Sequence, residues 1–144
     1  MAAYMKDELR GSPRVVHADG HHFTDVPAKF ISILNLASVR EVERVAGKPL
    51  DPLRFRANIH IDGAEPWAEF GWLSKTLEVD GTPAFRVAER IQRCAATSVD
   101  PQTAVRDMNL PRTLMSAFQH DDCGIYVSAT ADLVLKVGQQ ITIA

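Results

Sequence analysis

The stretch Thr76-Leu77-Glu78-Val79-Asp80-Gly81-Thr82-Pro83-Ala84-Phe85-Arg86-Val87 carries two short apolar runs on either side of an Asp-Gly pair. Asp-Gly tolerates the positive φ angles of a tight turn, and apolar runs that flank it are a strong local signal for a β-hairpin. We therefore predict strands over 76–79 and 84–87, and a β-rich domain built around them.

The neighbouring segments extend this pattern. Apolar and polar residues alternate with a period of two over 55–61, which predicts a strand that ends at a second Asp-Gly pair. Short apolar runs bounded by turn residues predict further strands at 30–34, 124–128, 133–137 and 141–143.

Two short helices are predicted between the strands. Ser38 followed by Glu41 has the spacing of a capping box, so we expect a helix over 38–46. Asn109-Leu110-Pro111 predicts the start of a second helix over 110–118. Several short strands that close on themselves, together with two small helices, indicate an α+β, mainly β, barrel-like domain.

Composition sets the size and class of this domain. The chain has 144 residues, of which 46% are hydrophobic, so a single globular domain with its own core is expected. We place that domain at 29–144, after a polar lead-in over 1–28 that we expect to be loosely structured.

Charge, hydrophobicity and cysteine content argue against several classes of protein. The net charge of -2 and the low aromatic content of 7% argue against a nucleic-acid-binding protein. The N-terminus lacks the apolar core of a signal peptide, and no apolar run is long enough to cross a bilayer. With only two cysteines, a disulfide scaffold is not expected. We therefore predict a cytoplasmic protein that does not bind membranes.

Cys94 is the first candidate for chemistry. It lies in the run Arg93-Cys94-Ala95-Ala96-Thr97-Ser98-Val99-Asp100-Pro101-Gln102-Thr103. A neighbouring arginine favours the thiolate, which is the form that attacks electrophiles and binds soft metals. The alternative is a small buried hydrophobic residue, as free cysteines often are.

A second candidate is the alternating segment that begins at Arg54. Strand periodicity predicts that Arg54, Arg56, Asn58 and His60 share one face. Such a face is either an anion-binding wall, because guanidinium donors match phosphate oxygens, or a set of solvated charges.

Three further groups of residues have weaker signals. Tyr126 is either a ligand contact or a core tyrosine with its hydroxyl satisfied. Cys123 is predicted to be structural, because the preceding Asp121 and Asp122 oppose ionisation of its thiol. The spacing of the histidines matches no standard zinc site, so solvated or structural roles are expected for His17, His21 and His22.

The motifs together resemble a known family. The pattern R-C-x-x-T-x-V-D-P-x-T at Arg93–Thr103 and F-R-x-N-I-x-x-D-G at Phe55–Gly63 resemble the MOSC domain, which is found at the C-terminus of molybdenum-cofactor sulfurases and in amidoxime-reducing molybdenum enzymes. The likeness covers about 27–141 and also includes W-A-E-F-G-W, G-I-Y-V and L-K-V-G. It is most similar to the small bacterial branch related to the amidoxime-reducing enzymes.

The resemblance implies a cofactor and two alternative activities. In the first, Cys94 ligates the metal of molybdenum-molybdopterin, and the cofactor's phosphate and pterin contact Arg56, Arg93 and Tyr126, with Asn58 on the same wall. The reaction would be the reduction of N-hydroxylated compounds, with electrons from an electron-transfer protein. In the second, Cys94 is a sulfur carrier that accepts a persulfide from a desulfurase partner, and pyridoxal phosphate enters only through that partner. A third alternative is a non-catalytic binding module that lacks the other half of its site.

Several positions depart from the family pattern. Ala57 replaces a proline, Ala104 replaces the glycine that usually closes the D-P-x-T-G turn, and Gln92 replaces a small hydroxyl residue. The turn at Ala104 is therefore expected to take a different conformation. The resemblance implies that longer family members place a second β-rich domain ahead of this one, and we do not expect that domain within these 144 residues. We nevertheless expect Arg56, Arg93 and Tyr126 to face one cleft with Cys94.

Overall fold

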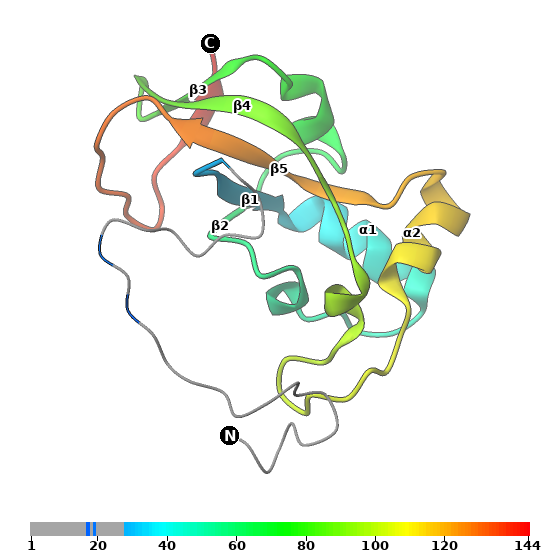
Figure 1. The fold of residues 1–144 in the computed structure, drawn as a ribbon. Coiled ribbons are helices and arrows are strands. Elements are labelled where there is room, and N and C mark those ends of the chain that lie inside the picture. Colours follow the sequence, from blue (N-terminus) through cyan, green and yellow to red (C-terminus); the bar gives the residue numbers. More distant parts are fainter. Residues whose placement is uncertain (1–16, 18, 20–27) are drawn as a thin grey trace.

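The computed structural model describes residues 17, 19 and 28–144. The predicted α+β, mainly β architecture is confirmed: a six-stranded mixed sheet curls into a half-barrel, and two α-helices lie at one end of it (Figure 1). The strands are β1 (Ile31–Asn35), β2 (Ile59–Ile61), β3 (Thr76–Val79), β4 (Thr82–Gln92), β5 (Asp122–Ala129) and β6 (Ile141–Ile143). The helices are α1 (Leu36–Ala46) and α2 (Leu110–Phe118), with three 3₁₀ turns η1 (Pro52–Phe55), η2 (Ala68–Trp72) and η3 (Ala95–Ser98).

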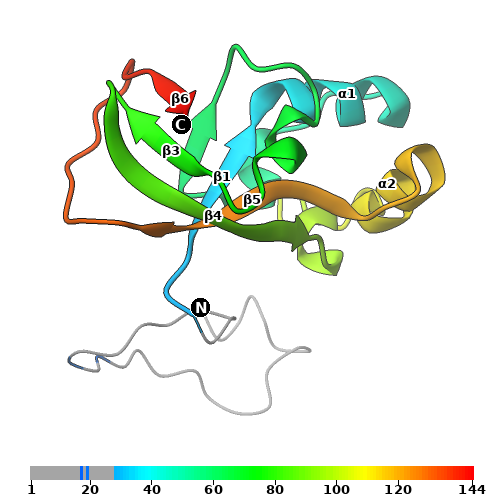
Figure 2. The ribbon, with the colours of Figure 1, turned by 90° about the horizontal axis from the view of Figure 1, so that it is seen from above.

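The strands follow the order β2-β1-β5-β4-β3-β6, so β2 and β6 are the two edges. All neighbours are antiparallel except β1 and β2, which are parallel and connected through α1. The sheet is strongly curved, and this curvature brings the two edge strands toward each other (Figure 2). The barrel is thus left open between β2 and β6.

Each face of the sheet has its own core. One cluster fills the inside of the half-barrel and contains Ile33, Leu77, Phe85, Val87, Ile125 and Val127, among others. A second cluster joins the other face to both helices and contains Leu34, Val42, Phe55, Leu110, Leu114 and Cys123. Burial of these side chains at about 1.5–3 kcal/mol each is the main force that holds the helices to the sheet.

Gly124 lets strand β5 contribute to both cores. Cys123 packs with the helices, whereas Ile125 packs inside the half-barrel, although both have the same parity along the strand. Gly124 has φ +83°, a left-handed conformation that interrupts the alternation between them. A Cβ at this position would lie 2.6 Å from the carbonyl oxygen of Ile33, so only glycine fits.

The predicted hairpin and both helices are confirmed, with one correction. Strands β3 and β4 pair around Asp80-Gly81, and Asn109 caps α2 through a hydrogen bond from the Arg112 N–H at 3.2 Å. The capping box at Ser38 was wrong, because α1 begins at Leu36 and its N-cap is Asn35. Ser38 is fully buried on the first turn of α1, where its hydroxyl donates to the carboxylate of Glu69 at 2.8 Å.

Two predicted strands differ from the structure. Only Ile59–Ile61 of the segment 55–61 forms a strand, because Pro52 opens a 3₁₀ turn capped by Asp51 that runs to Phe55. The segment 133–137 forms no strand and is an exposed connection from β5 to β6 (Figure 1). No helix in the described part of the chain is long and apolar enough to cross a membrane.

Candidate functional site

Cys94 lies where β4 ends, and its side chain is exposed. It is the N-cap residue of η3, and its carbonyl accepts hydrogen bonds from the backbone N–H and the hydroxyl of Thr97 at 3.2 and 2.9 Å. These bonds fix the backbone of Cys94 and leave its thiol accessible. Accessibility is what a metal ligand or a sulfur carrier needs.

Arg93, for which the family resemblance implies a contact with the cofactor, precedes Cys94 and is buried. Its Nε donates to the carbonyl of Cys123 at 2.7 Å and its Nη1 donates to the carbonyl of Phe55 at 2.9 Å. Its Nη2 is buried next to Gly124 and has no acceptor among the described residues. Burial lowers the pKa of Arg93, and the nearby Cys123, Tyr126 and Cys94 oppose that shift. Arg93 therefore connects the end of β4 to β5 and to η1. Its Nη2 remains without a hydrogen-bond acceptor among the described residues.

The segment between η1 and β2 carries the next two predicted residues, Arg56 and Asn58. Arg56 follows Phe55, is exposed and adopts φ 50° as the C-cap of η1. Asn58 is held on β1, because its Oδ1 accepts from the backbone N–H and the hydroxyl of Ser32 at 2.9 and 2.8 Å. These bonds hold the chain at Asn58, two residues after Arg56.

Tyr126 lies on β5 directly opposite Ser32 in the sheet register. Cross-strand neighbours share a face, so Tyr126 lies on the same face as Ser32, the residue that holds Asn58. Its ring stacks on Phe30 with 5.5 Å between centroids. Arg93 is near enough to Cys94 and to Tyr126 for electrostatic interaction with each, and Asn58 is bound to Ser32, which lies opposite Tyr126.

Arg54 does not share a wall with Arg56, as the alternating pattern had suggested. Its side chain is 3% exposed, and its guanidinium donates to Asp107 at 2.8 and 3.0 Å and to Asp100 at 2.9 Å. Lys48 adds a further bond to Asp107 at 3.0 Å. The sequence offers only a weak signal for this network, namely that Asp100 falls in one recognised motif and Arg54 directly precedes the other.

This network holds the loop that follows Cys94. Asp100 also accepts from the backbone N–H groups of Gln102 and Thr103 at 3.0 and 2.8 Å. Arg54 and Lys48 hold the pKa of Asp107 at about 2, chiefly through their hydrogen bonds. Ala104 takes φ 59°, so the turn keeps a left-handed residue although the usual glycine is missing.

Cys123 is fully buried in the core shared with the helices. Burial raises the pKa of its thiol to about 12, and Arg93 only partly offsets this. The dominant cause is therefore desolvation, whereas sequence reasoning had named the neighbouring aspartates. A thiol of this kind remains protonated at neutral pH.

The histidine candidates lie away from this site or outside the described residues. His17 is exposed and its Nε2 lies 2.7 Å from Asp19, whereas His21 and His22 fall outside the described part of the chain. Within 28–144 and the two isolated described positions, no group of three or more His, Cys, Asp or Glu side chains is arranged to hold a metal ion.

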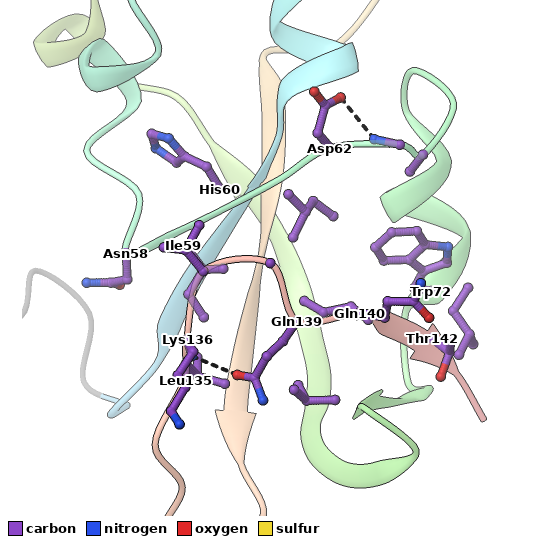
Figure 3. A pocket seen from close by; sticks show the side chains of 18 residues that line it. Asn58, Ile59, His60, Asp62, Trp72, Leu135, Lys136, Gln139, Gln140 and Thr142 are labelled. Carbon is purple, nitrogen blue, oxygen red and sulfur yellow. Dashed lines mark hydrogen bonds between the residues drawn. The ribbon is translucent and has the colours of Figure 1, made fainter.

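A groove of about 980 Å³ lies between the two edge strands. Its walls come from 58–64 in and around β2 and from 135–143 in and before β6 (Figure 3). Of the predicted site residues, Asn58 lines it, whereas Cys94, Arg93, Arg56 and Tyr126 do not. The groove thus shares Asn58, and none of the other predicted site residues, with the surroundings of Cys94.

Comparison with known proteins agrees with the motifs around Cys94. The MOSC domain family model matches residues 18–142. The chain belongs to the MOSC domain family. This match begins ahead of the boundary at residue 29 that composition suggested. A 61-residue segment is 39% identical to the molybdenum cofactor sulfurase of Danio rerio. That segment is 42% of this MOSC chain and 7% of the relative, so the chain spans a small part of that protein.

Proposed function

We propose that this MOSC domain binds a molybdenum cofactor through the thiolate of Cys94 and serves a molybdenum-dependent reduction of N-hydroxylated compounds. The observation that carries the proposal is the pairing of an exposed thiol with the buried Arg93, whose Nη2 has no acceptor among the described residues. A soft thiolate suits molybdenum, and an unused guanidinium donor suits an anionic or carbonyl-bearing ligand.

The residues around Cys94 fit such a cofactor in number and kind. Cys94 is one candidate metal ligand in a region without a three-residue metal cluster among the described residues, so most of the metal's ligands must come with the cofactor. We assign the exposed Arg56 to a phosphate of the cofactor, and Asn58 and Tyr126, which both neighbour Ser32, to the adjoining wall. When bound, the cofactor supplies a two-electron centre for cleavage of an N–O bond.

Molybdenum content tests this proposal. We expect near-stoichiometric molybdenum in protein purified from a host that makes the cofactor. Cys94→Ser should lose the metal while keeping the same circular dichroism spectrum, because its side chain is exposed. Cys123→Ala is the matched control and should retain the metal. Metal in Cys94→Ser at the wild-type level would contradict the proposal.

Activity is tested separately with an amidoxime and reduced methyl viologen as the electron donor. Turnover by the metal-loaded protein is expected, and Arg56→Ala should weaken cofactor retention more than Arg40→Ala. Metal binding without turnover would keep the cofactor assignment and remove the reductase assignment.

A sulfur-carrier function is the second candidate, favoured by the exposure of Cys94 and by the similarity to a molybdenum cofactor sulfurase. In that reaction the Cys94 thiolate attacks the outer sulfur of a desulfurase persulfide. The sulfur–sulfur bond of the donor breaks, its cysteine leaves as a thiolate, and Cys94 becomes the persulfide without net oxidation. Gain of 32 mass units on the Cys94 peptide, with no molybdenum in the purified protein, would favour this function.

A further inference from the structure

The connection between β5 and β6 has a strand-forming sequence but no strand partner. Residues 132–136 read Asp-Leu-Val-Leu-Lys, a composition that favours β-structure at its centre. Backbone groups of 131–135 make no hydrogen bond to another residue in the described part of the chain. Their N–H and C=O groups are therefore available to pair with another strand.

The side chains of this segment are unusually exposed for their type. Val134 is 83% exposed, Leu135 is 40% and Leu133 is 37%. Val137, in the same connection, and Ile143, on the edge strand β6, are exposed as well. Contiguous exposed apolar residues next to an unpaired edge are typical of an interaction surface.

The charged residues of the segment indicate which kind of strand can pair with it. An antiparallel pairing of two copies about Val134 places Asp132 of each copy opposite Lys136 of the other, and Leu133 opposite Leu135. Neither Asp132 nor Lys136 forms an ion pair with another described residue of its own chain. The sequence is thus complementary to itself under a two-fold axis.

We propose that two copies of this chain associate through the Asp132–Lys136 segments, which pair as antiparallel strands about Val134. The contact is isologous, so each copy presents the same surface and a closed dimer results. It lies on the β6 side of the half-barrel and involves none of the residues assigned to the Cys94 site. The inference is therefore independent of the proposed function.

Sedimentation velocity of the full chain over a range of concentrations tests this contact. Wild type is expected to shift from the mass of one chain toward that of two. Asp132→Lys places lysines opposite each other twice per dimer, and Lys136→Asp does the same with aspartates. Each variant should weaken dimerisation at least about tenfold, since like charges directly opposite are destabilising.

The decisive comparison is between these variants. Equimolar Asp132→Lys and Lys136→Asp chains should form a mixed dimer, because each lysine then faces an aspartate, and the double variant should dimerise like wild type. Met115→Lys changes an exposed apolar residue on α2 and should leave dimerisation unchanged. A wild type that stays monomeric at all concentrations would overturn the proposal. So would single variants that dimerise normally, or a mixture that stays monomeric.

Discussion

Replacing Arg54 with methionine removes the guanidinium that holds the loop behind Cys94. That side chain is 3% exposed and pairs with Asp100 and Asp107. Removal of one partner from a buried ion pair costs about 3–5 kcal/mol, because the other charge is left uncompensated. Here the side chains of Asp100 and Asp107 are 25% and 31% exposed, and Asp107 keeps Lys48. We therefore expect Arg54→Met to lower the free energy of unfolding by about 2–4 kcal/mol.

Urea unfolding followed by tryptophan fluorescence measures this loss. At an m-value of about 2 kcal/mol/M, the urea midpoint should fall by about 1–2 M with the slope unchanged. Arg40→Met is the matched control, since Arg40 pairs with Asp62 across a surface where both side chains are 58% exposed. Exposed pairs contribute little, so its midpoint should hardly move. Equal shifts in Arg54→Met and Arg40→Met would refute the role given to Arg54.

Three further measurements test the loop that follows Cys94 and the close approach of Gly124 to β1. The depressed pKa of Asp107, about 2, contributes stability above its unfolded pKa, which is lost as the pH falls through 2; urea midpoints measured from pH 5 to 2 should therefore decline, and less steeply in Arg54→Met. Ala104→Gly should raise the free energy of unfolding by about 0.5 kcal/mol, because relief of the φ 59° conformation outweighs the entropy that glycine adds to the unfolded chain; a lower melting temperature would contradict this. Gly124→Ala should cost about 2–5 kcal/mol, because its Cβ meets the Ile33 carbonyl at 2.6 Å in a left-handed conformation; a calorimetric loss below 1 kcal/mol would show that β5 can shift.

Local signals predicted most of the fold. The Asp80-Gly81 hairpin depends on adjacent residues, and the cap of α2 at Asn109 does too, so both were accessible from the sequence. The segment 133–137 has strand propensity, yet β3 pairs with β6 instead and leaves it without a partner. Propensity states what a segment favours, whereas the sheet order determines whether a neighbour exists.

The site was harder to predict because its interactions cross long sequence distances. Arg54 is drawn inward by Asp100 and Asp107, which lie 46 and 53 residues away. Glu69 is fully buried beneath α1, where Asn35 donates to it at 2.8 Å, and nothing local distinguishes it from a surface glutamate. Motifs located the segments around Cys94, but they did not show which charged side chains are buried.

Both proposed functions require that Cys94, and not Cys123, is the thiol that does chemistry. Alkylation of the folded protein with iodoacetamide between pH 6 and 9, followed by peptide mass mapping, compares the two cysteines directly. We predict that Cys94 is modified in the native state because it is exposed. Cys123 should react only after denaturation, because burial holds its pKa at about 12. Modification of Cys123 at an equal or faster rate than Cys94 in the folded protein would contradict the account.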